Sequence, residues 1–357
     1  MKESVWKGLF AGVFLFFLPA SLWASQLKSD EDVLFFPDLA WERPDGRMEV
    51  QVEAWVFEEE KRPGMASALA SYLDVDLGNL SPEENKIFSE RARLFKTDSE
   101  RWKRLEIIFD GNSRSFPLSS TNRAGRSSSR ILPDQKAPES EKILSFHLKP
   151  PKEISYQAEG FVLFIPKKGI SVISDLDDTV KVTEVLDKKK MLHNTFFKEF
   201  LAVPGMAELY RNLAREKVSF HYLSSSPIQL YPALHDFLVK EAFPEGSMHL
   251  RESTSWKTMI PGKKDSRKHK EGTILRLLHT FPERHFILIG DSGEADPEIY
   301  AEIARKYPEK ILAIGIRDVT GEDQKSKRYE KTFSGIPEDR WLIFREAPKW
   351  QDFLKKN

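Results

Sequence analysis

From residue 169 onward, short apolar runs alternate with amphipathic stretches of helical period. The runs that we expect to form strands are residues 170–173, 218–223, 286–289, 311–316 and 341–344. The stretches that we expect to form helices are residues 205–216, 227–239, 271–280 and 297–307. This alternation predicts an α/β fold with a parallel sheet covered by helices on both faces. In such sheets ligands bind at the carboxyl ends of the strands.

The part of the chain before residue 166 has a different pattern. Residues 48–56 and 104–109 alternate with the period of a strand, and residues 143–148 and 161–165 are two further short strand candidates. Two stretches between them look helical, residues 64–73 and 82–94, and residues 119–141 are rich in Ser, Arg, Pro and Asn and predict a long exposed loop. We therefore expect a β-rich domain over residues 28–166, followed by the α/β domain over residues 167–357.

The first 24 residues have the layout of a secretory signal peptide. Lys2 and Lys7 precede the apolar residues 9–18, and residues 19–24 form a cleavage region ending at Ala24. The apolar run is half as long as a membrane-spanning helix needs. Leu22 is an imperfect cleavage residue, and an uncleaved membrane anchor is the alternative. The pattern predicts an exported protein, periplasmic or secreted.

Composition narrows the possibilities in two ways. Lys+Arg and Asp+Glu both total 55, so no overall field favours nucleic acid, and we expect no nucleic-acid partner. The 357-residue chain contains no cysteine, which excludes disulfides, thiolate metal sites and a lipidated cysteine. An exported protein without disulfides needs a core of its own, which this length supplies.

Polar residues follow the predicted strands where each strand ends. Asp175 and Asp177 come directly after the first strand, with one residue between them. Charge beside a buried strand is costly unless it is used. One of the two carboxylates could attack an electrophile while the other transfers a proton.

Residues that suit the same site follow the other predicted strands. Ser224 follows the second strand and could hold a phosphate oxygen, while Asp291 and Asp296 follow the third and offer the oxygen ligands that Mg²⁺ prefers. A basic run over residues 263–270 precedes the helix expected at residue 271, and one of its lysines could neutralise a phosphoryl group. Taken together, these residues favour phosphoryl transfer.

The sequences of three motifs resemble those of one protein family. Residues 174–181 (SDLDDTVK), 221–227 (HYLSSSP) and 289–300 (IGDSGEADPEIY) are similar to the phosphatidate phosphatase catalytic domain of the actin-patch-associated type, in the lipin-related branch of the haloacid dehalogenase superfamily. The resemblance covers about residues 166–345. It implies a Rossmann-like parallel sheet of the haloacid dehalogenase type without a large cap, preceded by the smaller β-rich domain.

The resemblance also implies a role for each site residue. Asp175 would form an aspartyl-phosphate, Asp177 would act as general acid and base, and Ser224 and Lys270 would hold the phosphoryl oxygens. Mg²⁺ would bind the Asp175 carboxylate, the backbone carbonyl of Asp177 and Asp291, with Asp296 as a further ligand or as an orienting carboxylate. Lys268 competes with Lys270, because the basic run leaves the alignment ambiguous by two residues. Three further matching residues, Asp178, Lys181 and Glu184, we expect to cap and brace the loop.

The reaction and the substrate remain open between three hypotheses. Ester hydrolysis needs an acid at Asp177 and dehalogenation does not, so a phosphatase is favoured over a dehalogenase. The resemblance implies hydrolysis of phosphatidate to diacylglycerol, and an open site with basic residues 263–270 suits an anionic phospholipid and contact with a membrane surface. The alternatives are an exported phosphatase of soluble phosphomonoesters, such as nucleotides or sugar phosphates, and a non-catalytic binding protein.

Overall fold

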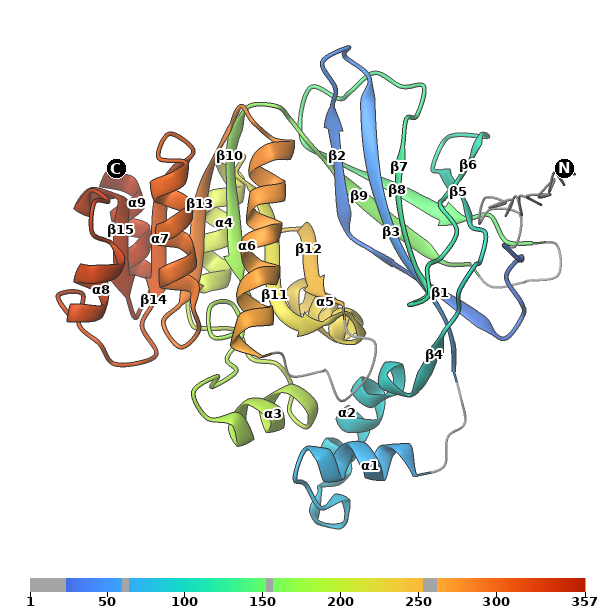
Figure 1. Ribbon diagram of the computed structural model, residues 1–357, viewed down its shortest axis with the longest axis horizontal. Coiled ribbons are helices and arrows are strands. Elements are labelled where there is room, and N and C mark those ends of the chain that lie inside the picture. Colours follow the sequence, from blue (N-terminus) through green and yellow to red (C-terminus); the bar gives the residue numbers. More distant parts are fainter. Residues whose placement is uncertain (1–23, 60–63, 152–156, 253–261, 357) are drawn as a thin grey trace, which may run out of the picture.

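The computed structural model describes residues 24–59, 64–151, 157–252 and 262–356, which form two β-sheets with helices packed around them (Figure 1). The predicted signal peptide, apart from Ala24, lies outside the described residues. Within the described ranges no helix is both long enough and apolar enough to cross a membrane.

The second half of the chain forms a six-stranded, fully parallel sheet in the order β12-β11-β10-β13-β14-β15. Its strands are β10 Gly169–Asp175, β11 Ser219–Pro227, β12 Gly246–Arg251, β13 Arg284–Asp291, β14 Ile311–Arg317 and β15 Trp341–Phe344. The chain runs outward from β10 to β12 and then starts again at β13 on the other side of β10. This switch point lies at the carboxyl end of β10, where sheets of this kind bind ligands. The predicted parallel sheet is confirmed.

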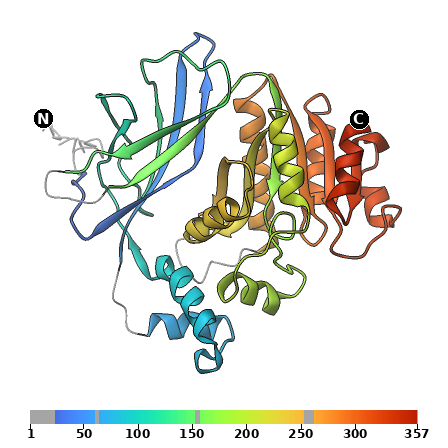
Figure 2. The same ribbon diagram turned by 180° about the vertical axis from the view of Figure 1, so that it is seen from behind.

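Helices cover both faces of this sheet, as the alternation predicts (Figures 1 and 2). One face packs against α4 Met206–Arg215, α5 Tyr231–Lys240 and α9 Ala347–Lys356, and the other against α6 Lys263–Thr280, α7 Asp296–Lys306 and α8 Lys327–Thr332. Consecutive strand residues point to opposite faces, so Val172 joins the first hydrophobic cluster and Ile173 the second. Both faces are therefore buried, which explains why these strands are almost continuously apolar.

Helix α6 begins at Lys263, so the predicted start at residue 271 is wrong by eight residues and the basic run of residues 263–270 belongs to the helix. Lysine and arginine are good helix formers, and they extend the helix wherever they can face solvent. The buried face of α6 includes Lys270, Ile274 and Leu277, which recur at helical spacing. Lys270 therefore lies in the third turn of a helix, pointing inward, rather than at its start.

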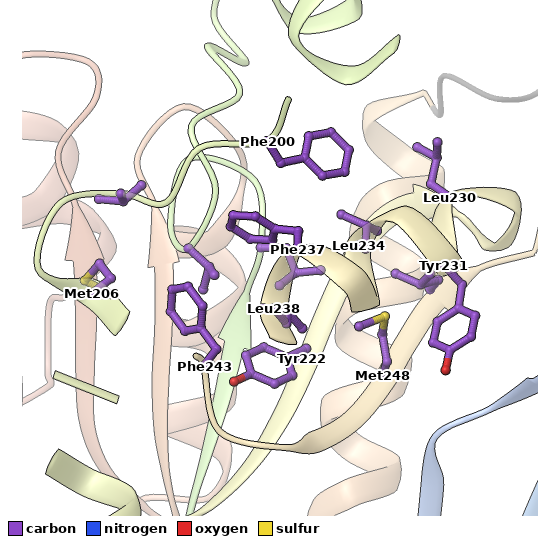
Figure 3. Close-up of a cluster of buried hydrophobic side chains, with 14 of the residues drawn as sticks. Phe200, Met206, Tyr222, Leu230, Tyr231, Leu234, Phe237, Leu238, Phe243 and Met248 are labelled. Atoms are coloured by element: carbon purple, nitrogen blue, oxygen red, sulfur yellow. The ribbon is translucent and has the colours of Figure 1, made fainter. Parts of the chain in front are cut away.

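A cluster of aromatic and aliphatic side chains fixes α5 against β11 and β12 (Figure 3). Tyr222 from β11 and Met248 from β12 pack against Leu234 and Phe237 of α5, and all four side chains are at most 5% exposed. Each large apolar side chain buried in this way contributes about 1.5–3 kcal/mol. This packing anchors β11, whose C-terminal part carries Ser224.

The first half of the chain forms a nine-stranded sheet in the order β1-β3-β2-β9-β8-β5-β6, with β4 and β7 also paired to β3. Among the described strand pairs of this sheet, β2 and β9 pair in parallel and the others are antiparallel. The strands are β1 Glu31–Phe36, β2 Asp38–Glu42, β3 Met48–Glu59, β4 Thr97–Ser99, β5 Glu106–Phe109, β6 Ser115–Pro117, β7 Arg126–Ile131, β8 Lys142–Leu148 and β9 Glu159–Ile165. All four predicted strands of this half are confirmed, as β3, β5, β8 and β9.

The long exposed loop predicted over residues 119–141 is wrong for residues 126–131, which form β7. This serine-rich strand pairs with the centre of β3. Ser127 donates its hydroxyl to the Ser119 carbonyl at 2.7 Å, and the Ser129 hydroxyl accepts from the Ser119 amide at 2.8 Å. These local hydrogen bonds satisfy the buried hydroxyls, so a polar segment can occupy a strand without an apolar pattern.

A helical insertion connects β3 to β4 and extends away from the N-terminal sheet. It contains α1 Met65–Tyr72, the short turn η2 Leu77–Asn79, α2 Pro82–Ala92 and the turn η3 Arg93–Lys96. Helix α2 starts with a capping box, in which Ser81 and Glu84 each accept from the other's backbone amide. Both predicted helices are confirmed, and the insertion reaches α3 Lys188–Phe196 of the second half (Figure 1).

The two sheets meet where the change in pattern predicts a boundary, between the end of β9 at Ile165 and the start of β10 at Gly169. The buried Arg284 donates to the carbonyls of Pro166 and Lys168, both at 2.8 Å. Leu163 and Ile165 of β9 also pack in the same hydrophobic cluster as α6. The two sheets therefore share core contacts, and folding as independent domains stays a prediction.

Candidate functional site

The first aspartate pair lies at the carboxyl end of the central strand. Asp175 is the last residue of β10 and its side chain is 1% exposed, whereas the side chain of Asp177 is 14% exposed. Leu176 between them is buried in the hydrophobic core and anchors the turn. The two carboxylates therefore face different surroundings, as their proposed division of labour requires.

Three buried carboxylates meet beside β10. Oxygen atoms of Asp175, Asp291 and Asp296 all lie within 4.8 Å of one another. Asp291 is the last residue of β13 and Asp296 the first of α7, so two neighbouring strands and one helix N-terminus bring them together. Burial and the charge of Asp296 raise the pKa of Asp175 and of Asp291, and burial raises the pKa of Asp296 to about 6.

Lys270 supplies the positive charge of this cluster. Its Nζ lies 2.7 Å from Asp175 Oδ1, 2.6 Å from Asp296 Oδ1 and 2.7 Å from Glu294 Oε2, and its side chain is 1% exposed. Burial would lower the pKa of Lys270, but the three carboxylates raise it well above its usual value. The exposed Lys268 instead lines a separate cleft between the two sheets. The geometry therefore favours Lys270 for the position that the basic run left ambiguous.

Glu294 is a site residue that the sequence interpretation did not single out. Its side chain is 28% exposed, and its carboxylate pairs with Lys270 on the solvent-exposed side of the cluster. Glu294 lies inside the acidic motif of residues 289–300, so its position was visible in the sequence. Its ion pair depends on how α6 packs against the loop after β13, and this packing has no local signal.

The donor set fits a hard divalent cation. Asp175 Oδ2 and Asp291 Oδ2 are buried and accept no hydrogen bond within the described ranges. Buried carboxylate oxygens without partners are costly, and an oxygen-ligated cation would satisfy them. The predicted contribution of the Asp177 backbone carbonyl stays a prediction.

Asp177 is held as a carboxylate by a separate group of donors. Lys181 Nζ and Thr183 Oγ1 lie 2.9 Å from its Oδ1, and Ser224 Oγ donates to its Oδ2 at 2.9 Å. Burial alone would raise the pKa of Asp177, but the Lys181 ammonium and these hydrogen bonds together lower it to about 2. In this state Asp177 is ionised at neutral pH, so it can donate a proton only after it has gained one.

The Ser224 hydroxyl therefore contacts the second aspartate of the pair. Its hydroxyl also accepts from the Ser226 amide at 2.9 Å, and Ser226 Oγ lies 3.3 Å from Asp177 Oδ2. A hydroxyl can rotate, so Ser224 could transfer its hydrogen bond to a phosphoryl oxygen. Its predicted phosphate-binding role stays a prediction.

Asp178 braces the loop that follows the aspartate pair. It has φ 53°, and its carboxylate accepts from the amides of Thr183, Glu184 and Val185 at 2.7–2.9 Å. This is the bracing role that we expected for Asp178. Glu184 has a similar role, since it pairs with Lys190 and accepts from Asn194, both at 3.0 Å.

Two glycines allow the acidic motif to approach its neighbours closely. A Cβ on Gly290 would lie 2.3 Å from Asp296 Oδ2, and one on Gly293 would lie 2.7 Å from a methyl group of Val185 and 2.9 Å from Asp291 Oδ1. No side chain fits in either space. Glycine at these positions is therefore a condition for bringing Asp291 and Asp296 together.

A pocket of about 560 Å³ opens beside Asp177 and Glu294. Its polar side carries hydroxyl groups, including those of Ser226 and Ser292. Its apolar side comes from the segment that ends in α3, from the end of β11 and from the turn before α5, with the residues Val185, Met191, Leu192, Phe196, Pro227 and Leu230. A pocket of this volume accommodates a small organic group next to the acidic cluster.

The comparisons with known proteins agree with the predicted resemblance. Residues 170–318 match the family described as the catalytic domain of phosphatidate phosphatase APP1. Phosphatidate phosphatase APP1 of Saccharomyces cerevisiae is 36% identical over 160 residues, and an uncharacterized protein of Schizosaccharomyces pombe is 36% identical over 169 residues. These alignments cover 43% and 46% of this chain and 27% of each relative. The resemblance is therefore confirmed for the α/β half, while the chain spans about a quarter of the length of these curated relatives.

Solved structures give a weaker comparison. A β-phosphoglucomutase candidate from Thermotoga maritima aligns with 53% of this chain and 99% of its own, at 14% identity and a TM-score of 0.33. An uncharacterized protein from Listeria monocytogenes aligns with 53% of this chain and 98% of its own, at 11% identity and a TM-score of 0.32. Neither score is high enough to support an argument about fold or function.

The donors around Asp177 generate a testable prediction. Replacing the buried Lys181 by methionine removes the ammonium beside Asp177 but keeps an apolar stem against Phe200. We expect the pKa of Asp177 to rise from about 2 by about 1–3 units, because an opposite charge within hydrogen-bond distance is lost. Carboxyl ¹³C chemical shifts followed against pH would measure this change.

The matched control is Lys190→Met, which removes an exposed ammonium from Glu184 on the same loop. We expect this variant to leave the titration of Asp177 where it is in the parent protein. If Lys181→Met leaves the pKa of Asp177 unchanged as well, then the Lys181 ammonium does not keep Asp177 ionised and the prediction is wrong.

Proposed function

We propose that this protein is a Mg²⁺-dependent phosphatase that forms an aspartyl-phosphate on Asp175 and hydrolyses phosphatidate to diacylglycerol and phosphate. The observation that carries the proposal is the buried cluster of Lys270 with Asp175, Asp291 and Asp296 at the carboxyl ends of adjacent parallel strands. The family match over residues 170–318 supports the phosphatase class and the phospholipid type of substrate. We also infer a sheet of the haloacid dehalogenase type, with α3 standing where a large cap would otherwise be inserted.

Asp175 is the nucleophile in this proposal. An oxygen of its carboxylate attacks phosphorus, the new Asp–O–P bond forms, and the bond to the ester oxygen breaks. Asp175 Oδ2 accepts no hydrogen bond within the described part of the chain, so this oxygen is not already engaged. Lys270 holds the other oxygen in position and balances the negative charge that the phosphate group brings.

The metal-binding part of the proposal rests on Asp175, Asp291 and Asp296. Mg²⁺ bound by these carboxylates would neutralise charge on the phosphoryl oxygens and allow two anions to approach each other. The orphaned Oδ2 of Asp291 and the raised pKa values of all three residues support this assignment. Lys270 and Glu294 stay next to the ligands and orient them.

Asp177 carries out both proton transfers. In the first step it donates a proton to the leaving alkoxide, and in the second it removes a proton from the water that attacks the aspartyl-phosphate. Lys181, Thr183 and Ser224 keep the pKa of Asp177 low in the free protein, so Asp177 is ionised, as a general base must be in the second step. For the first step Asp177 must gain a proton, and transfer of the Ser224 hydrogen bond to the phosphoryl group would favour this.

The lipid substrate is supported by the pocket as well as by the family match. Its apolar side next to Asp177 suits an ester group with hydrocarbon character better than a nucleotide or a sugar. The exposed Lys263 lies at the same pocket, at the start of α6, and would favour an anionic lipid surface. The proposal includes export to the periplasm or to the exterior, because residues 1–24 have the pattern of a signal peptide.

The metal assignment predicts a change in thermal stability. Adding Mg²⁺ to the parent protein should raise its melting temperature, because a ligand that binds only the folded state stabilises it. We expect Asp291→Asn to abolish most of this increase. Without Mg²⁺ the variant should melt at the same temperature as the parent or higher, because one of the mutually repelling carboxylates is gone.

Calorimetric scans with and without Mg²⁺ would measure both effects, with Asp110→Asn as a control at an exposed site of the N-terminal sheet. An equal Mg²⁺ response in Asp291→Asn and in the parent would contradict the assignment of the cation to this cluster.

The proposed activity is tested by phosphate release from phosphatidate in mixed micelles and from a panel of soluble phosphomonoesters. We expect the parent to prefer the lipid and to need Mg²⁺. Asp175→Asn should lower the rate by at least about 10³-fold, because the amide is a poor nucleophile. Lys268→Met is the control, since this lysine is exposed on another side of α6, and it should keep its rate within about twofold.

A preference for soluble esters would replace phosphatidate by the alternative substrate class. Undiminished phosphate release by Asp175→Asn would overturn the mechanism itself. A binding effect that survives in a protein without any phosphatase activity would favour the non-catalytic hypothesis.

A further inference from the structure

The apolar wall of the pocket is formed mainly by one short helix and the loop before it. Val185, Met191, Leu192 and Phe196 come from residues 185–196, and α3 itself has only nine residues. A helix of this length is marginal without tertiary packing. The position of the wall must therefore be set by what α3 packs against.

The strongest polar contact of α3 comes from the N-terminal half of the chain. Arg91 of α2 is buried, and its Nη1 donates to the carbonyl of Thr195 at 2.6 Å. The Thr195 carbonyl belongs to the last turn of α3, where a helix leaves its acceptors unpaired and a cation is favourable. The same guanidinium lies 3.7 Å from the ring centroid of Phe200, the ring that Lys181 also contacts at 4.7 Å.

Aromatic contacts from the same insertion reach the wall directly. Phe95 packs edge-on against Phe196, with ring centroids 5.6 Å apart, and Phe196 is itself a wall residue. Phe88 stacks on Phe197 with centroids 4.9 Å apart and an interplanar angle of 12°. Aromatic pairs of this kind contribute beyond the area that they bury.

Two ion pairs at the periphery align the insertion with α3 and add little stability. Asp74 lies 2.7 Å from Lys189, and Glu84 lies 3.5 Å from His193. Exposed pairs contribute little free energy, but these place the turn after α1 and the first turn of α2 along the length of α3. Residues 65–96, about a hundred positions before α3 in the sequence, thus form its supporting surface (Figure 1).

We propose that the apolar wall binds the hydrocarbon chain of the substrate and that the helical insertion of the N-terminal sheet holds this wall in place. The first half of the chain would then determine substrate preference, a role that its own residues do not suggest. The proposal rests on the proposed function, since the hydrocarbon belongs to the phosphate ester whose phosphorus meets Asp175. Arg91 and Phe88 are positioning residues, and Val185 and Met191 contact the chain.

Binding of alkylphosphonates in the presence of Mg²⁺ tests this without requiring catalysis, because the carbon–phosphorus bond is not hydrolysed. We expect octylphosphonate to bind the full-length protein at least about tenfold more tightly than butylphosphonate, from partial burial of four additional methylene groups. Isothermal titration calorimetry would give both dissociation constants.

Variants of the wall test where this selectivity comes from. The double variant Val185→Thr with Met191→Gln nearly conserves volume at two half-buried positions and makes the wall polar. We expect the octyl-to-butyl ratio to fall below about threefold. The control is Leu186→Gln, whose side chain is 59% exposed and outside the pocket lining, and which should keep the ratio of the parent.

Variants of the insertion test the support. Arg91→Met removes the hydrogen bond to α3 and should lower the ratio at least threefold, while Arg91→Lys should recover part of it. The control is Arg93→Met, two residues after Arg91, which removes an exposed ion pair with Glu59 and should leave the octyl-to-butyl ratio unchanged. Phe88→Leu provides a second positioning variant if Arg91→Met does not fold, as judged by its melting temperature.

Each outcome decides a part of the proposal. If octylphosphonate fails to bind, binds no more tightly than butylphosphonate, or keeps its advantage in the double wall variant, the wall does not hold the chain. If the wall variant loses selectivity and both insertion variants keep it, the insertion has no part in substrate preference. These results are independent of phosphate release, so they can fail while the proposed phosphatase activity stands.

Discussion

The site depends on one buried charge, the Lys270 ammonium, placed among carboxylates that would otherwise repel one another. Its Nζ lies within 2.7 Å of Asp175, Asp296 and Glu294, and none of the three could be kept close to the others without it. A buried cluster of this kind is costly in isolation, because taking each charge out of water is unfavourable. Such an arrangement persists where it has a use, and the remaining negative charge and unpaired oxygens are what a divalent cation and a phosphoryl group would require.

The rest of the α/β half can be understood as what brings these charges together. The switch in strand order at β10 places the ends of β10 and β13 side by side, and the absence of a side chain at Gly290 lets Asp296 approach. Asp178 folds the next loop onto itself, so that Lys181 and Thr183 reach Asp177 and not the cluster. Two aspartates two positions apart thus differ sharply in environment, with the pKa of Asp175 raised and that of Asp177 lowered to about 2. A cation bound beside Asp175 would lower the pKa of that residue, and transfer of the Ser224 hydrogen bond to a phosphoryl group would raise that of Asp177, so both values would move toward the proposed roles of nucleophile and acid.

Sequence patterns predicted the parts of the fold that repeat locally. The parallel strands and the strand-end positions of Asp175, Asp177, Ser224 and Asp291 follow from apolar runs ending in polar residues. The start of α6 was missed, although Lys270, Ile274 and Leu277 continue one helical face, because the surrounding lysines resemble a solvated loop. Strand β7 has no apolar period, and its serines are satisfied by tertiary hydrogen bonds. The pairing of Glu294 with Lys270 and the support of α3 by Arg91 join distant segments, and no local pattern encodes such contacts.

The central claim, that Asp175 accepts the phosphoryl group, has a direct chemical test. An acyl phosphate is reduced by borohydride to an alcohol, whereas a free carboxylate is not, so quenching the protein during turnover of phosphatidate with Mg²⁺ would convert a phosphorylated aspartate to homoserine. Peptide mass spectrometry would then locate the change. The account predicts homoserine at position 175, dependent on substrate and at no other aspartate. Steady phosphate release with Asp175 unmodified, or reduction at a different aspartate, would contradict it.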